Sequence, residues 1–162
     1  MFDVFTEEIE VTIKDGIANS YWYKGDLHKA WLRSGVDQRL YKEISNIKGD
    51  GGNTLSKRKQ MDVLYEKLRL SDKNKRLEIS RNFVRILIEH ENFVPQDEKH
   101  RIEIAERAAL KLQKIISEQE KERETRDRIR RDAKKILNED YYSQLKLLKD
   151  EFIRIRNQPG II

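Results

Sequence analysis

Both tryptophans of this chain, Trp22 and Trp31, fall within residues 21–32, together with two of its six tyrosines. Aromatic side chains bury large apolar areas and therefore tend to seed a core. Charged residues make up 39% of the sequence and apolar residues 37%, so few other segments can nucleate packing. We therefore predict that the fold is organised around residues 21–32, and we interpret the aromatic side chains as core rather than as a ligand site.

Composition and apolar spacing predict an all-α fold, a multi-helix bundle. Glycine and proline are few, and the many Lys, Glu, Arg, Leu and Ile residues favour helices. Apolar residues recur every fourth position from Phe5 to Ile17, which predicts a first helix over residues 6–21. Alternatively, Asp15-Gly16 could form a turn between two short strands.

Further helix starts are indicated by short polar side chains that can cap free backbone amides. We expect helices that begin at Asp26, Asp37 and Thr54, and another that begins at Ser71-Asp72. The last of these is expected to end at residues 92–95, because the residue before a proline avoids helical angles.

The character of the sequence changes at about residue 96. Residues 117–128 contain no apolar side chain, so a helix there must stand in solvent or face a polar partner. An apolar stripe resumes at Ile129, and its later spacings of three and four are typical of a coiled coil. A bend at residues 138–140 would turn this part into a long charged helical hairpin. The stripe supplies a candidate interaction seam, hereafter the seam: Leu145, Leu148, Phe152 and Ile155.

These patterns predict two regions: a compact helical domain over residues 1–95, and a hairpin or linker over residues 96–162. No basic region followed by an apolar run opens the chain, and no apolar run approaches the roughly 20 residues that span a membrane. With no cysteine there is no thiolate chemistry, which is compatible with a cytoplasmic location.

Few features of the sequence carry chemistry. The three histidines lack the spacing of metal ligands, and no serine stands in a nucleophile elbow. The glycine-rich loop at residues 48–53 has neither the preceding strand nor the Gly-Lys-Ser/Thr ending of a phosphate-binding loop. We therefore expect no catalytic residue, no metal and no cofactor, and no small-molecule substrate is evident.

Basic residues concentrate between Ser56 and Arg85, where ten of them stand against four acidic residues. This excess of six is larger than the +5 net charge of the whole chain. A run of three lies in the first turn of a predicted helix, where side chains and free amides can reach phosphate. The alternative is that these basic residues simply form a solvent-exposed face and contact no phosphate. The candidate nucleic-acid contacts are Lys57, Arg58, Lys59, Lys73, Lys75, Arg76 and Arg81.

The aromatic run also carries a resemblance. Residues 17–27, followed by Leu32-Arg33, resemble the opening of a group of bacterial restriction-endonuclease-like proteins, with an Asn-x-Tyr-Trp-Tyr-Lys-x-Asp-Leu run. Residues 56–64 are similar to the next helix of that group. Three later segments resemble its linking helix and the segment before its nuclease domain: residues 106–109, 118–131 and 145–152.

This resemblance implies the helical N-terminal module of a phage-defence protein. The nuclease module of that group opens with an Arg-Gly-Tyr-x-Leu-Glu type helix, which does not follow here, so no catalytic residue is carried over. The leading hypothesis is a non-catalytic recognition module that contacts DNA phosphates. An interaction or oligomerisation module built on the seam is the second hypothesis, and a nuclease in its own right is the third.

Overall fold

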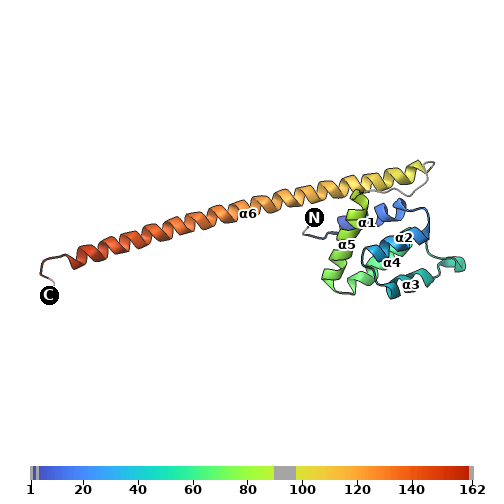
Figure 1. Ribbon diagram of the computed structural model, residues 1–162, viewed down its shortest axis with the longest axis horizontal. Coiled ribbons are helices and arrows are strands. Elements are labelled where there is room, and N and C mark those ends of the chain that lie inside the picture. The colour runs from blue at the N-terminus through green and yellow to red at the C-terminus, as the bar shows by residue number, and fades with distance from the viewer. Residues whose placement is uncertain (1, 3, 90–97, 161–162) are drawn as a thin grey trace. The chain divides into compact units, whose positions relative to one another are not determined.

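The computed structural model describes residues 2, 4–89 and 98–160 of the chain. The described residues form helices and connecting turns, and the β-structure among them is one isolated bridge between Lys48 and Thr54. The predicted all-α, multi-helix fold is confirmed. In order, the elements are α1 (Glu7–Ser20), α2 (Lys24–Arg33), α3 (Gln38–Asn46), the 3₁₀ turn η1 (Asp50–Gly52), α4 (Lys57–Arg69), α5 (Lys73–Glu89) and α6 (Lys99–Arg156) (Figure 1).

The chain divides into two units, which are described separately. Unit 1 comprises Met1–Gln119 and unit 2 comprises Glu120–Ile162. The boundary therefore falls inside α6, whereas the sequence placed a change at residues 95–96, outside the described residues. The first part of α6 belongs to unit 1 because Ala105, Ala108 and Leu112 are buried there.

Most helix starts in unit 1 follow from local capping. The side chains of Thr6, Asp37 and Ser56 accept hydrogen bonds from the first-turn amides of α1, α3 and α4. The predicted caps at Asp26 and Thr54 are wrong. Asp26 lies inside the first turn of α2, where it pairs with Lys29, and Thr54 lies before α4 in the bridge with Lys48.

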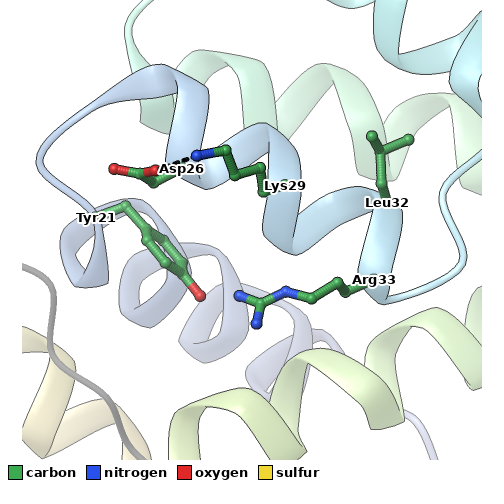
Figure 2. A pocket seen from close by; sticks show the side chains of 5 residues that line it. All are labelled: Tyr21, Asp26, Lys29, Leu32 and Arg33. Atoms are coloured by element: carbon green, nitrogen blue, oxygen red, sulfur yellow. Dashed lines mark hydrogen bonds and ion pairs between the residues drawn. The ribbon is translucent and has the colours of Figure 1, made fainter.

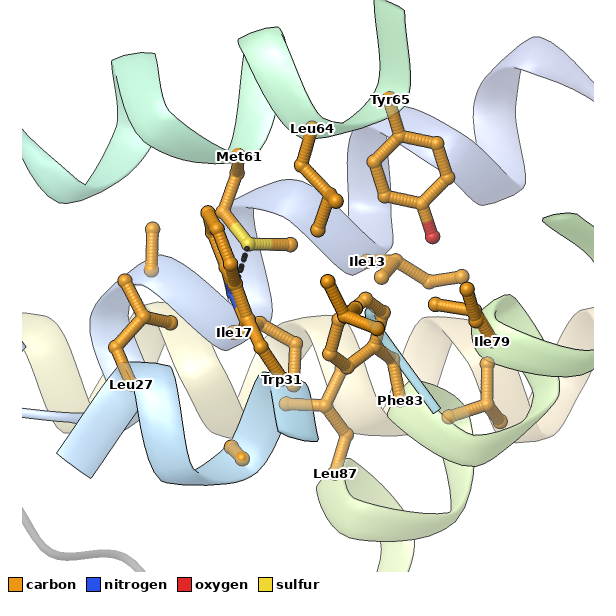
Figure 3. Close-up of a cluster of buried hydrophobic side chains, with 14 of the residues drawn as sticks. Ile13, Ile17, Leu27, Trp31, Met61, Leu64, Tyr65, Ile79, Phe83 and Leu87 are labelled. Atoms are coloured by element: carbon orange, nitrogen blue, oxygen red, sulfur yellow. Dashed lines mark hydrogen bonds between the residues drawn. The ribbon is translucent and has the colours of Figure 1, made fainter. Parts of the chain in front are cut away.

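The core of unit 1 lies between α1, α2, α4 and α5 (Figure 3). Trp31 is completely buried, and its indole N–H points to the sulfur of Met61 at 3.1 Å. Tyr21 is buried as well, so the aromatic segment does supply core. Its neighbours Trp22 and Tyr23 are 38% and 67% exposed, which corrects the prediction that both tryptophans are core. They lie in the turn between α1 and α2, where the backbone at Tyr21 and Tyr23 is extended rather than helical.

Gly16 allows close packing in the middle of α1. A Cβ at this position would lie 2.9 Å from the Cβ of Ala108 in α6 and 2.9 Å from a methyl of Leu87 in α5. The side-chain-free backbone therefore lets three helices approach one another. The alternative of a turn at Asp15-Gly16 is wrong, because α1 continues through both residues.

Helix α6 is continuous from Lys99 to Arg156. The bend predicted at residues 138–140 is absent, so the hairpin is wrong and the extension is one helix. No glycine or proline interrupts residues 99–156, and Asn-Glu-Asp is compatible with a helix, because glutamate is a good helix former and asparagine and aspartate are moderate ones.

Candidate interaction surfaces

Lys57, the first predicted phosphate contact, instead closes the end of α1. The last turn of α1 contains no basic residue of its own. The Lys57 ammonium donates to the carbonyls of Tyr21 and Trp22, and the Arg101 guanidinium donates to those of Tyr21 and Ala18 at 2.9 and 3.2 Å. Unpaired carbonyls and the negative end of the helix dipole attract cations at this position. Two distant segments thus supply the charges that α1 lacks.

The crowding of cations around this turn changes the acidity of Lys57. Burial, followed by the charges of Arg101 and Lys24, lowers the pKa of the Lys57 ammonium from 10.5 to about 8. Arg101 also stacks over the ring of Trp22, with its guanidinium carbon 5.3 Å from the ring centroid. These interactions explain why Trp22 is held in place although it is partly exposed.

Arg58 belongs to a ladder of ion pairs between α1 and α4. Its guanidinium lies 2.7 Å from both Asp15 and Asp62, and Asp62 also pairs with Lys14 at 2.9 Å. At the far end of the two helices, the nearly buried carboxylate of Glu10 pairs with Arg69. The charge of Arg58 is therefore balanced within the fold.

Arg76 and Arg81 hold the N-terminal segment against α5. Arg76 stacks over the ring of Phe5 at 5.2 Å. Arg81 donates to the carbonyl of Phe2 at 3.0 Å and lies 5.9 Å from the Phe2 ring centroid. Both arginines thus have structural partners.

The remaining three candidates, Lys59, Lys73 and Lys75, have exposed side chains. Within the described residues, no hydrogen bond or ion pair engages their ammonium groups. Lys59 lies in the first turn of α4, and Lys73 and Lys75 lie in the first turn of α5. The rise along α4 from Lys59 to its last residue, Arg69, is about 15 Å. Of the seven predicted residues, four therefore have structural partners, and the ammonium groups of the other three face solvent.

The seam is exposed along unit 2. The exposed fractions are 44% for Leu145, 67% for Leu148, 68% for Phe152 and 47% for Ile155. Tyr141 lies four residues before Leu145, and its side chain is 60% exposed. On a helix of 3.6 residues per turn, spacings of four, three, four and three keep these side chains on one face. Among the described residues of unit 2, no side chain packs over that face.

Concave sites on unit 1 are shallow. One depression of about 520 Å³ is lined by Tyr21, Asp26, Lys29, Leu32 and Arg33, and the Asp26–Lys29 ion pair is part of that lining (Figure 2). Among the residues that the structure describes, no group of three or more His, Asp or Glu side chains could hold a metal ion. His28 is a packing residue, because it bonds to Gln60 at 2.7 Å and contacts Trp31 and Tyr41 edge-on.

In the glycine-rich loop at residues 48–53, backbone amides donate hydrogen bonds to carbonyls of the loop itself. Gly49 donates to the carbonyl of Asn53 at 2.8 Å, and Gly52 donates to that of Gly49 at 3.1 Å. Gly51 and Gly52 both have positive φ angles, near 77° and 76°, which only glycine adopts readily. The sequence thus needs glycines here to close a tight turn between α3 and α4.

A scan against protein-family models and searches of curated proteins and of solved structures found no match to this chain. In the described part of the chain, no helix is long and apolar enough to cross a membrane.

Proposed function

We propose that this chain is a non-catalytic assembly module that pairs with a second copy of itself through the seam. The observation that supports the proposal is the exposure of the seam, whose four apolar side chains are 44–68% accessible on one face of one helix. Helices gain most of their stability in proteins from packing an apolar face, and α6 has no such packing in unit 2. Fully burying a side chain of this size contributes about 1.5–3 kcal/mol.

The repeat favours a parallel pair in register. In coiled-coil notation Leu145 and Phe152 occupy a positions, and Tyr141, Leu148 and Ile155 occupy d positions. Asn138 then falls at the preceding a position, where a single asparagine specifies register by pairing with its own copy. An antiparallel pair that matches the same apolar residues places Asn138 against Ile155, leaving a polar amide against a hydrocarbon side chain.

Charged residues beside the seam agree with the parallel arrangement. Gln144 and Glu151 occupy g positions, and Lys149 and Arg156 occupy the e positions that face them on a parallel partner. Glu151, which pairs with Arg154 of its own chain at 2.6 Å, would therefore also face Arg156 of the second copy. Such pairs set the orientation of a coiled coil more than its affinity.

Two neighbouring leucines allow a matched test. Leu148 is in the seam and Leu147 is outside it, yet they are 67% and 70% exposed. Because both are exposed in the single chain, Leu148→Gln and Leu147→Gln should affect the monomer equally, and glutamine keeps a helix propensity near that of leucine. Sedimentation velocity should give a dimer for wild type and for Leu147→Gln, and a monomer for Leu148→Gln. A wild-type monomer at all accessible concentrations would end the proposal.

Contact with DNA phosphates through unit 1 is a second candidate function. It is favoured by the exposed ammonium groups of Lys59, Lys73 and Lys75, and by the resemblance to restriction-endonuclease-like proteins. In such a defence protein the module would recognise DNA or assemble copies, and a separate domain would cut. Lys59→Gln/Lys73→Gln/Lys75→Gln should then weaken duplex binding at low salt.

A further inference from the structure

A strongly basic segment lies immediately before the seam on α6. Residues 126–135, hereafter the basic segment, contain six basic and two acidic side chains, a net charge of +4, while the whole chain carries +5. All ten residues are helical and exposed. Within the described part of the chain, none of the six forms an ion pair: Arg126, Arg128, Arg130, Arg131, Lys134 and Lys135.

The basic face continues the face of the seam. Arg130 precedes Leu148, and Lys134 precedes Phe152, by about five helical turns, so each pair points in the same direction. If the repeat of the seam is continued toward the N-terminus, Arg131 takes an a position and Lys134 takes a d position. Two parallel copies would therefore bring like charges face to face there, and an apolar contact cannot continue.

We infer that two copies paired through the seam hold their basic segments apart as a fork that binds duplex DNA between its arms. This inference rests on the pairing argued under Proposed function. Repulsion between the two basic faces separates the helices on the N-terminal side of Asn138. Phosphates placed between the arms neutralise those charges and release counterions.

The side chains of the basic segment identify duplex DNA as the ligand. The major groove of DNA is about 12 Å wide and admits an α-helix, and continuous basic helices that diverge from a dimer enter it in this way. Single strands are bound largely by stacking of bases on aromatic rings, and residues 126–135 contain no aromatic residue. The deep, narrow major groove of duplex RNA does not admit a helix.

The test compares two triple variants of the full chain that remove the same charge. Arg130→Gln/Arg131→Gln/Lys134→Gln neutralises the basic face, and Lys59→Gln/Lys73→Gln/Lys75→Gln neutralises the exposed lysines of unit 1. Binding of a short labelled DNA duplex is followed by fluorescence anisotropy at roughly 50 and 200 mM salt. The first variant should lose at least about tenfold in affinity and show a shallower salt dependence, and the second should bind like wild type.

Three results would overturn the fork. The first is that the basic-face variant binds duplex DNA with wild-type affinity. The second is that both triple variants lose the same amount of affinity. The third is that wild type binds single-stranded DNA of the same length as tightly as it binds the duplex. Leu148→Gln should weaken duplex binding at least about tenfold although it removes no charge, because it separates the arms. Leu147→Gln should bind as wild type does.

Sedimentation of the same samples separates this inference from the function on which it rests. If wild type is a monomer with and without DNA, the pairing fails and the fork fails with it. If wild type is a dimer and the basic-face variant is a dimer that binds DNA undiminished, only the fork fails. A dimeric variant that has lost DNA binding supports both.

Discussion

Phe83 and Phe152 both lie on helices with an apolar face, but Phe83 is completely buried and Phe152 is 68% exposed. In unit 1 the apolar face of each of α1, α2, α4 and α5 meets a face of another helix of the same unit. In unit 2 the described residues form one helix, which cannot bury a face against itself.

The contrast teaches that one amphipathic pattern has two meanings. Where a chain supplies several apolar helix faces, those faces pack against one another and form a core, so their side chains contribute to the stability of the fold. Where it supplies one, the pattern leaves a surface that only another molecule can cover.

Phe83→Ala should destabilise unit 1 by about 3–5 kcal/mol. The ring is fully buried among the core residues of α1, α2 and α4, so its loss leaves a cavity (Figure 3). Urea unfolding followed by tryptophan fluorescence measures the change, because both tryptophans, Trp22 and Trp31, belong to unit 1. A loss below about 1 kcal/mol would mean that the ring is not in a packed core.

Gly16→Ala should destabilise unit 1 by about 1–3 kcal/mol, although alanine is the better helix former. The added methyl would lie 2.9 Å from the Cβ of Ala108, and neither backbone can easily withdraw. Gly25→Ala is the matched control, because a Cβ there meets no atom within 4 Å. Equal stability changes in the two variants, measured by urea unfolding, would contradict the close packing of α1, α5 and α6.

Lys57→Gln should change how stability depends on pH. The pKa of Lys57 is about 8 in the folded chain and 10.5 as a reference, so between these values the unfolded state binds more protons. Stability from this group therefore rises with pH across that window. The stability of wild type relative to the variant should increase from pH 8 to 10.5 in urea unfolding. A constant difference would mean that the ammonium keeps its ordinary pKa.

The difference in stability between wild type and Lys57→Gln isolates the effect of Lys57, because other groups that titrate in this pH range are the same in both proteins. Burial raises the pKa of the Tyr65 hydroxyl, and its bond to Ser80 at 3.0 Å opposes that effect. The carboxylate of Glu43 raises the pKa of Lys67. Both contributions are present in wild type and variant alike, so they cancel.

The sequence predicted the helices of unit 1 well because their signals are local. Apolar spacing located α1, and the side chain of Asp37 marked the start of α3. Asp26 and Thr54 misled because capping residues are common, and a neighbouring residue began the helix instead. The hairpin failed because residues 138–140 tolerate a bend without requiring one.

The partners of charged residues could not be predicted, because they depend on distant segments. Lys57 and Arg58 looked available for phosphate, but the end of α1 and the carboxylate of Asp15 engage them. Arg101 was missed entirely. The missing basic residue in the last turn of α1 was a usable signal, since such an end commonly attracts a cation from elsewhere.

The smallest effect expected is that of Phe152→Ala on the single chain, within about 0.5 kcal/mol. The substitution is the same as at Phe83, but the ring at position 152 touches solvent over most of its surface. At low protein concentration, urea unfolding followed by circular dichroism, whose helical signal includes α6, should therefore match wild type. A loss comparable to that of Phe83→Ala would mean that Phe152 is already packed within the chain.

A second prediction for Phe152 concerns how the thermal stability of α6 depends on protein concentration. If wild type pairs through the seam, the melting temperature of α6 should rise with concentration, because association stabilises the folded state by mass action. Circular dichroism at increasing concentration should show this rise in wild type and little of it in Phe152→Ala. Equal concentration dependence would place the contact between copies elsewhere on the molecule, and the exposed seam would then need a different partner.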